Sequence, residues 1–461
     1  MFTGSTEVAG IIQRNLAGRL DAQGRTIPLI AETGGQNAML VDSSALTEQV
    51  VVDVIASAFD SAGQRCSALR VLCVQEDVAD RVLTMLKGAM AEYNLGNPER
   101  LCTDIGPVID DEAKANIERH VQAMRDKGRK VHQLSRASGE EIKRGTFVLP
   151  TLIELDSLDE LKREIFGPVL HVVRYRRAEL DGLLEQINAS GYGLTMGVHT
   201  RIDETIAQVV DSARVGNLYV NRNMVGAVVG VQPFGGEGLS GTGPKAGGPL
   251  YLYRLLATRP QEAVSRQLQD GEAQRSDVKG AAFPALLEWA RKQQPGLAEL
   301  AERYAALSVS GLTQVLSGPT GERNTYSLLP RERVLCLADD AQDLLAQLAA
   351  ALAVGCKVLW SDNAANRKLL GQLPSGVQQG IQLIGDWTTS ELAFDAILHH
   401  GDSDQLREVC QLAAKRPGAI VGVTGLNKGD TEIPLERLLI EHALSVNTAA
   451  AGGNASLMTI G

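Results

Sequence analysis

Short apolar runs alternate with amphipathic stretches from Ile27 to about Arg259, and this alternation constrains the fold most. Ala38–Val41 and Arg70–Val74 are predicted strands, while the stretches from Val50 to Ala62 and from Asp77 to Tyr93 are predicted helices. Strands that alternate with helices are typical of α/β proteins with a parallel sheet. We therefore predict an α/β architecture for this part of the chain.

The segment Gly226–Gly248 is too rich in glycine to form a packed helix or a plain strand. It is predicted to be a long loop. A long loop inside a compact domain is usually functional.

A second α/β unit is predicted in the carboxy-terminal half. Its buried-strand runs are 333–338, 357–360, 380–384, 396–398 and 419–423, and helix-forming stretches such as 343–350 and 405–412 lie between several of them. This rhythm predicts a parallel, Rossmann-like sheet with right-handed crossovers. Because a GxGxxG fingerprint is absent, no dinucleotide is assigned to this unit. The polar residues 259–280 before it are predicted to be a surface linker or a solvated helix.

Charge and cysteine usage narrow the function classes. The 461 residues carry 45 basic and 55 acidic side chains, a formal net charge of -10, which argues against nucleic-acid binding. No apolar run is long enough to span a membrane and the start has no leader signature, so a cytoplasmic location is expected. The six cysteines show no CxxC pair or zinc-like spacing, so we expect reduced thiols and no metal site.

The first residues look like the end of a strand that turns into a helix. Ser5 or Thr6 would cap this helix, and Glu7 would complement its positive end. No strand partner precedes this βα unit in the sequence. We therefore expect an amino-terminally truncated piece of a larger protein.

Two residues are candidates for chemistry on local grounds. Cys66, between Arg65 and Ser67, follows a helix-like run, and a nearby cation favours the reactive thiolate. Glu32 ends an apolar strand against a Gly-Gly turn, where burial would raise its pKa toward the range of a general base. The alternatives are a buried structural thiol and a turn-capping acid.

Two further segments could bind a ligand. Glu164 and Phe166 alternate in an extended stretch, where the carboxylate could bind ribose hydroxyls and the ring could pack against a flat heterocycle. Phe234, between proline and glycine, could form a pocket wall. Each pattern is common by itself, and on local grounds alone Phe234 is more often the anchor of an ordinary loop.

Five motifs occur in a specific order along the chain. They are Phe-Thr-Gly-Ser at 2–5, Glu-Thr-Gly-Gly-Gln-Asn at 32–37, Gly-Gln-Arg-Cys-Ser-Ala at 63–68, Glu-Ile-Phe-Gly-Pro at 164–168 and Pro-Phe-Gly-Gly at 233–236. Together they resemble the NAD(P)-dependent aldehyde dehydrogenase superfamily, over residues 2 to about 258.

Two further sequence segments narrow the resemblance to one branch of this superfamily. Residues 221–236 and 241–248 are similar to the L-glutamate γ-semialdehyde dehydrogenase (1-pyrroline-5-carboxylate dehydrogenase) half of the bifunctional proline utilization A family. Residues 281–461, including 318–324 and the closing segment 447–458, resemble the extra carboxy-terminal domain of its longer members.

This resemblance implies a domain layout. It consists of a remnant of the NAD-binding domain at 1–32, the aldehyde dehydrogenase catalytic domain with its return segment at 33–258, a linker at 259–280, a carboxy-terminal α/β domain at 281–425 and a docking tail at 426–461.

The resemblance also implies a mechanism in proline catabolism. Cys66 would attack the aldehyde carbon, NAD would accept the hydride, and Glu32 would activate the water that releases L-glutamate. Gly4 and Ser5, at a helix N-terminus, would contact the cofactor pyrophosphate. The other implied cofactor contacts are Thr33, Gly34, Glu164 for the nicotinamide ribose and Phe166 beside the ring.

The implied substrate, L-glutamate γ-semialdehyde, carries a carboxylate. The resemblance assigns its binding to Arg65, Ser67, and the backbone N–H groups of Gly226 and Ala227, with Phe234 along the aliphatic chain. A guanidinium suits a carboxylate because its donors form a fork.

Some family features are absent from this chain. Most of the NAD-binding domain is missing, including an oxyanion-hole asparagine, so we expect the isolated chain to be inactive. The resemblance implies that the parent protein also holds an FAD-dependent proline dehydrogenase, through which it could contact a membrane, and forms homo-oligomers. Two alternatives remain, namely another semialdehyde dehydrogenase and a non-catalytic scaffold in which Cys66 would not react rapidly with a thiol reagent.

Overall fold

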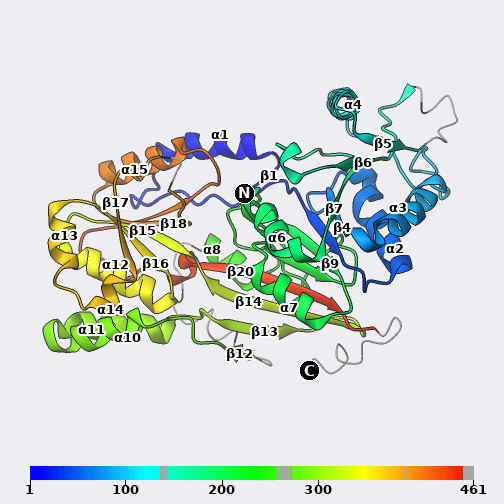
Figure 1. Ribbon diagram of the computed structural model, residues 1–461. Helices are drawn as coiled ribbons and strands as arrows, with labels where there is room; N and C mark the ends of the chain where they lie inside the picture. The colour runs from blue at the N-terminus through cyan, green and yellow to red at the C-terminus, as the bar shows by residue number, and fades with distance from the viewer. Residues whose placement is uncertain are drawn as a thin grey trace. The chain divides into compact units, whose positions relative to one another are not determined.

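The structure is a computed structural model that describes residues 1–134, 142, 144–256, 260, 268, 273–389 and 392–449. It forms two compact units (Figure 1). The first unit comprises residues 1–32, 241–316 and 325–442. The second comprises residues 33–240, 317–324 and the chain from 443 onward.

The second unit is built on one twisted sheet. Its strands have the order β20-β10-β9-β3-β4-β7-β6-β5, and neighbouring strands are parallel except for the antiparallel pair of β5 and β6. The bounds are β3 (Ala38–Val41), β4 (Val71–Gln75), β5 (Lys130–Gln133), β6 (Thr151–Leu155), β7 (Val169–Tyr175), β9 (Thr195–His199), β10 (Asn217–Val220) and β20 (Leu439–Asn447), of which 443–447 belong to this unit. A separate two-stranded sheet of this unit is formed by β8 (Tyr192–Gly193) and β11 (Glu237–Gly238), which are antiparallel.

Helices cover both faces of this sheet. They are α2 (Thr47–Phe59), α3 (Glu76–Ala91), α4 (Asp111–Asp126), α6 (Leu180–Ala189) and α7 (Asp203–Ser212). The connections through α2 and α3 run one way along the sheet, and those through α6 and α7 run the other way, so right-handed crossovers place the two pairs on opposite faces (Figure 1). Accordingly, every residue of β3, β4, β9 and β10 is buried.

The predicted helix from Val50 to Ala62 is wrong at its end. The α-helix stops at Phe59, and a 3₁₀ turn over Asp60–Gly63 follows, in which Ser61 and Ala62 have left-handed φ angles of 56° and 54°. The turn brings Gly63 so close to the Gly167 carbonyl that a Cβ on Gly63 would lie 2.2 Å from that oxygen. The prediction extended the helix because the apolar periodicity continues through Ala62. In the structure the chain turns at Asp60–Gly63, where Gly63 approaches the Gly167 carbonyl.

The first unit contains the predicted second parallel sheet. Its strand order is β17-β16-β15-β18-β19, and all four pairs are parallel, which confirms the prediction. The bounds are β15 (Arg333–Leu337), β16 (Lys357–Ser361), β17 (Ile381–Ile384), β18 (Ala396–His400) and β19 (Gly422–Leu426). The helices of this unit are α8 (Pro249–Leu255), α10 (Ala282–Gln293), α11 (Pro295–Leu307), α12 (Ala341–Val354), α13 (Ala364–Leu370), α14 (Ser375–Gln378) and α15 (Ser403–Lys415).

Three further strands, β12 (Ala273–Arg275), β13 (Leu312–Leu316) and β14 (Glu322–Pro330), follow one another in sheet order. β12 pairs antiparallel with β13. Within the predicted linker or solvated helix at 259–280, the helix alternative is wrong for Ala273–Arg275, because backbone hydrogen bonding to β13 holds these exposed residues extended. Most of 259–272 lies outside the described residues.

The amino-terminal segment has the predicted strand-to-helix form. β1 (Phe2–Thr3) pairs in parallel with β2 (Ala31–Glu32), and α1 (Thr6–Ala17) follows. Ser5 is the N-cap, because its hydroxyl accepts a hydrogen bond from Val8 N–H at 3.3 Å. Among the described residues, no helix is both long and apolar enough to cross a bilayer.

Two contacting histidines, the buried His171 and the half-buried His120, should give the second unit a pH-dependent stability. His171 Nδ1 donates to the Arg70 carbonyl oxygen at 3.1 Å, so its Nε2 accepts from His120 Nε2 at 2.8 Å. Burial lowers the pKa of His171 to about 3 and that of His120 to about 4. Both rings are therefore neutral in the folded protein at pH values where the unfolded chain binds protons.

The melting temperature should therefore fall as the pH is lowered from about 6.5 toward 4, since protons stabilise the unfolded state in this window. Burial raises the pKa of Asp53 to about 6 and also raises those of Asp60 and Glu164, which opposes the trend, whereas it lowers the pKa of His199 to about 4, which adds to the trend. His171→Asn keeps a donor toward Arg70 and should flatten the profile, measured as melting temperature against pH. Equal slopes for the two proteins would contradict this origin.

Candidate active site

The candidate site of the second unit lies on loops that precede the strands of its sheet. Cys66 precedes β4, Glu164 and Phe166 precede β7, and Thr33 and Gly34 precede β3. These segments meet at the amino ends of neighbouring parallel strands. Open α/β sheets commonly bind ligands at the carboxyl ends instead, so this placement was not predictable from the alternation of strands and helices.

Arg70, a residue to which the sequence analysis gave no role, lies at the centre of these loops. Its side chain is 1% exposed and forms an ion pair with Glu164, with Nε and Nη2 donating to the same oxygen, Oε1, at 3.1 and 3.0 Å. The remaining donors bond the carbonyl oxygens of Gly63 at 2.7 Å, Gly167 at 3.2 Å and Arg65 at 3.0 Å. One buried cation thus joins the Cys66 loop to the Glu164 segment.

Three predicted cofactor residues are brought together around Arg70. Its guanidinium lies 5.1 Å from the centre of the Phe166 ring, which is 46% exposed. Gly34 lies against the Glu164 carboxylate, where a Cβ would be only 1.9 Å from Oε2. Gly34 is therefore needed for the close approach of this carboxylate. A signal for Arg70 was available, because an arginine that opens an apolar strand must find a buried partner.

Burial and charge act against each other at this ion pair. Burial raises the pKa of Glu164, although Arg70 and a backbone N–H bond from Gly35 oppose the shift. Burial likewise lowers the pKa of Arg70, against the charges of Glu164 and the Cys66 thiolate. Arg70 therefore lies within electrostatic reach of the sulfur, and a nearby cation favours the thiolate form of a cysteine.

The Cys66 loop is held by a second residue that the sequence analysis missed, Asn37. Its Nδ2 donates to the carbonyl oxygens of Cys66 at 2.7 Å and Ala68 at 2.9 Å, and its Oδ1 accepts from Thr195 N–H at 3.2 Å. Ser67 is buried, and its carbonyl accepts from the Thr195 hydroxyl at 3.3 Å. The backbone around Cys66 is therefore fixed from the starts of β3 and β9. Cys66 itself is half-buried and forms no disulfide.

The predicted substrate residues lie on two loops. Arg65 flanks Cys66, and its Nε donates to Ser61 Oγ at 3.1 Å. Gly226 and Ala227 lie on the loop that follows β10, where Gly226 has a φ of 77°. Ser57 of α2 contacts both loops, because its Oγ accepts from Met224 N–H at 3.1 Å and its carbonyl accepts from Leu69 N–H at 2.9 Å.

Phe234 ends the loop after β10. The Asn217 side chain fixes both of its neighbours, with Nδ2 donating to the Pro233 carbonyl at 2.9 Å and Oδ1 accepting from Gly235 N–H at 3.2 Å. Because Asn217 is the first residue of β10, Phe234 also lies at an amino end of the sheet.

The remaining predicted residues belong to the first unit. Glu32 ends β2, and its Oε1 is buried; its backbone carbonyl accepts from Gly4 N–H at 3.1 Å. Gly4 and Ser5 are exposed at the start of α1, whose first N–H groups form a helix N-terminus suited to an anion. Cys66 and Glu32 are in different units, and their meeting at one reactive carbon stays a prediction.

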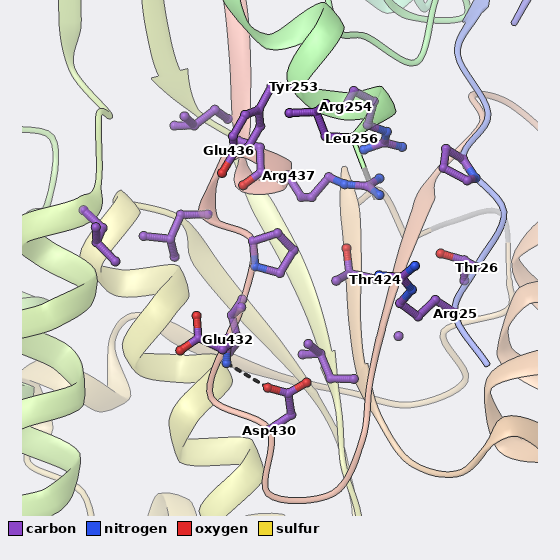
Figure 2. Close-up of a pocket in the computed structure, with 18 of the residues that line it drawn as sticks. Arg25, Thr26, Tyr253, Arg254, Leu256, Thr424, Asp430, Glu432, Glu436 and Arg437 are labelled. Carbon is purple, nitrogen blue, oxygen red and sulfur yellow. Dashed lines mark hydrogen bonds between the residues drawn. The ribbon is translucent and has the colours of Figure 1, made fainter. Parts of the chain in front are cut away.

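A cavity of about 750 Å³ lies elsewhere, within the first unit (Figure 2). Charged residues of both signs line it, including Arg25, Arg254, Arg437, Asp430 and Glu432. Burial lowers the pKa of Arg437 to about 10. The cavity contains none of the predicted site residues among its lining.

Comparisons with known proteins agree with the motif pattern. The model of the aldehyde dehydrogenase family matches residues 1–259. Bifunctional protein PutA of Escherichia coli (strain K12) is 67% identical over 470 residues, which cover 100% of this chain and 36% of that protein. The 1-pyrroline-5-carboxylate dehydrogenase of Geobacillus kaustophilus is 38% identical over 253 residues, covering 54% of this chain and 48% of the relative.

A solved structure extends the similarity to nearly the whole chain. Proline utilization A (PutA) from Corynebacterium freiburgense matches with a TM-score of 0.70 and 25% identity, over 97% of this chain and 41% of that chain. This chain therefore spans well under half the length of these PutA proteins. Because the family model covers more than half of its residues, the chain belongs to the aldehyde dehydrogenase family.

Proposed function

We propose that this chain supplies the nucleophile and the substrate-binding loops for the NAD-dependent oxidation of L-glutamate γ-semialdehyde to L-glutamate. The observation that carries the proposal is the Arg70 cluster, which joins the Cys66 loop to Glu164, Phe166 and Gly34. The similarity to PutA and to 1-pyrroline-5-carboxylate dehydrogenase supports the choice of substrate.

The reaction would begin at Cys66. Its thiolate adds to the aldehyde carbon to give a thiohemiacetal, and loss of hydride leaves a thioester. Glu32 would then take a proton from water, which attacks the thioester, releases L-glutamate and restores the thiol. A buried carboxylate suits this role because burial disfavours its charged form, so that it takes up a proton more readily.

NAD would accept the hydride. The exposed start of α1 with Ser5 fits a pyrophosphate, since the positive end of the helix dipole and the N–H groups of a helix N-terminus favour an anion. Glu164 fits a ribose hydroxyl, because Arg70 donates only to Oε1 and a carboxylate can accept further hydrogen bonds besides those of Arg70 and the Gly35 N–H. Phe166, half-exposed beside Arg70, would pack near the nicotinamide ring.

The substrate carboxylate would be bound by Arg65, Ser67 and the N–H groups of Gly226 and Ala227. Hydrogen bonds to a charged group are stronger than those between neutral groups. Phe234, fixed through Asn217, would contact the aliphatic chain.

The test uses a chimera in which this chain replaces the matching segment of Escherichia coli PutA, so that the complete NAD-binding domain is present. The chimera should reduce NAD with L-glutamate γ-semialdehyde, while the isolated 461 residues, as the control, should not. A chimera that folds and oxidises propanal but not the semialdehyde would favour the alternative of another semialdehyde dehydrogenase. A chimera inactive with every aldehyde would favour a scaffold.

The Ser67→Ala variant of the chimera should raise KM for L-glutamate γ-semialdehyde by about tenfold, because one hydrogen bond to a charged group is lost. The KM for propanal, which has no carboxylate, should stay within about twofold. Steady-state NADH formation measures both values. Equal effects on the two aldehydes would reject the assignment of Ser67 to the carboxylate.

A further inference from the structure

The loop that carries Gly226 and Ala227 has little structure of its own. Residues 221–233 form no helix or strand, and Gly226 and Gly230 have φ angles of 77° and 79°. Val228 and Val229 at its tip are 56% and 86% exposed. Apart from the Val228 carbonyl, which accepts from the N–H groups of Val231 and Gln232, the conformation of the loop depends on contacts near its two ends.

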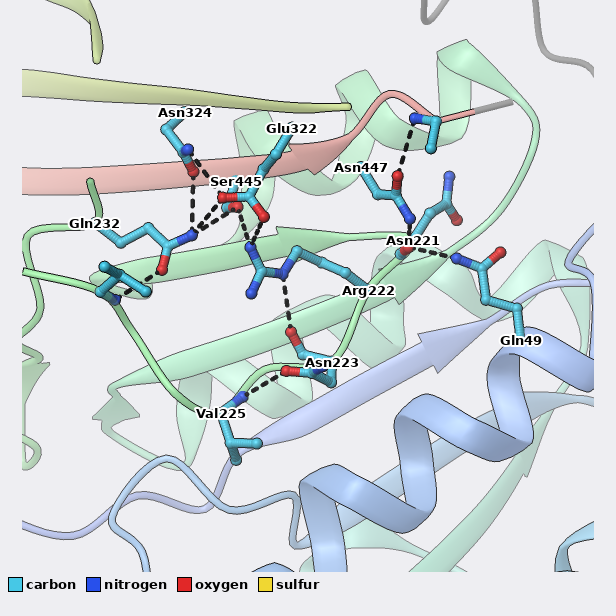
Figure 3. Close-up of polar contacts among 12 residues, drawn as sticks. Gln49, Asn221, Arg222, Asn223, Val225, Gln232, Glu322, Asn324, Ser445 and Asn447 are labelled. Carbon is cyan, nitrogen blue, oxygen red and sulfur yellow. Dashed lines mark hydrogen bonds and ion pairs between the residues drawn. The ribbon is translucent and has the colours of Figure 1, made fainter. Parts of the chain in front are cut away.

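Two long side chains at these ends reach the same carboxylate (Figure 3). Arg222 forms an ion pair with Glu322 through Nη1, and Gln232 Nε2 donates to Glu322 Oε1 at 2.7 Å. Glu322 thus holds two residues that are ten positions apart along the loop. Its side chain and that of Arg222 are each only 16% exposed, so solvent screens this pair weakly.

Two neighbouring polar groups complete the contact. Ser445 Oγ accepts from Arg222 Nη1 at 2.9 Å and from Gln232 Nε2 at 3.3 Å. Asn324 Oδ1 also accepts from Gln232 at 3.3 Å, and its Nδ2 donates to Glu322 Oε1 at 2.9 Å. Gln232, Asn324 and Ser445 are 4%, 1% and 2% exposed. A buried network of this kind selects one geometry, because any displaced member leaves unpaired polar groups.

The network also reaches into the loop. Gln232 Oε1 accepts from Val228 N–H at 3.1 Å, one residue beyond Ala227, and Arg222 Nε donates to the Asn223 carbonyl at 3.2 Å. Outside the network, the Asn221 carbonyl at the loop start accepts from Asn447 Nδ2 at 3.0 Å and from Gln49 Nε2 at 2.6 Å (Figure 3). The loop backbone is therefore held on both sides of Gly226 and Ala227.

We propose that Glu322, with Ser445, is a positioning residue that holds the N–H groups of Gly226 and Ala227 ready for the substrate carboxylate. The inference rests on the proposed function of that loop. Glu322 lies about 100 residues beyond Arg222 in the chain and Ser445 more than 200, and neither is among the proposed substrate-binding residues. Their segments thus contribute to specificity through the loop.

The test compares Glu322→Gln, Glu322→Ala and Ser445→Ala in the chimera. Glu322→Gln keeps the size of the side chain but removes its charge. For both Glu322 variants, KM for L-glutamate γ-semialdehyde should rise about tenfold or more, with kcat and the KM for propanal nearly unchanged. Ser445→Ala should also raise KM for L-glutamate γ-semialdehyde, but by a smaller factor. The matched control is Glu432→Gln, which removes the charge of a more exposed ion pair with Arg303 in the first unit.

A second readout does not depend on activity. Hydrogen–deuterium exchange of peptides covering 224–232 should be faster in Glu322→Gln than in the control, at an unchanged melting temperature. If the exchange and KM of Glu322→Gln and Ser445→Ala both equal those of the control, the proposal is overturned. If the unmodified chimera does not oxidise the semialdehyde while exchange still rises, the proposed function fails but the loop is held as described.

Discussion

Replacing Cys66 with alanine in the chimera should lower kcat for L-glutamate γ-semialdehyde by roughly 10⁴-fold or more. In the proposed mechanism the thiohemiacetal and the thioester both form on this sulfur, and water cannot take over the covalent step at a comparable rate. Because Asn37 holds the loop through backbone atoms of Cys66 and Ala68, the fold should tolerate the change. NADH formation and the melting temperature, measured together, separate lost chemistry from lost structure.

The matched control is Cys102→Ala, since Cys102 is exposed and lies outside the site loops. Its activity should equal that of the unmodified chimera. A Cys66→Ala protein that kept a tenth or more of the activity would show that another group is the nucleophile, and the mechanism proposed above would be abandoned.

Replacing Arg70 with methionine should destabilise the second unit by about 3–5 kcal/mol, the usual cost of removing one partner of a buried ion pair. The change leaves Glu164 as an unpaired carboxylate in a site where burial already raises its pKa. It also leaves the carbonyl oxygens of Gly63, Arg65 and Gly167 without the donors they have now. The free energy of unfolding in urea is the measurement, made on the isolated 461 residues.

The control for Arg70→Met is Arg81→Met, because Arg81 forms an exposed ion pair with Glu48. Such surface pairs contribute about 0–1 kcal/mol. The double variant Arg70→Met with Glu164→Leu removes the buried charge as well and should recover part of the lost stability. A loss for Arg70→Met no larger than that for Arg81→Met would show that the cluster does not hold the Cys66 loop.

The sequence determined those features that depend on neighbouring residues. Alternating apolar runs indicated both parallel sheets, and the Ser5 cap followed from a polar residue before a helix-like run. The motifs around Cys66, Glu32 and Glu164 indicated the family, because each is a short stretch with a fixed spacing. All of these features can be recognised without knowing which strands are neighbours in the sheet.

The tertiary structure alone decided how distant residues meet. Arg70 and Glu164 are 94 residues apart, and Gln232 and Ser445 are 213 residues apart. Their pairing depends on the order of strands in the sheet, which places the starts of β3, β4 and β7 side by side and β20 next to β10. Local periodicity reports whether a strand is buried, but it carries no information on which strand lies beside it, so the partners of Arg70, Asn37 and Glu322 could be recognised only in the folded chain.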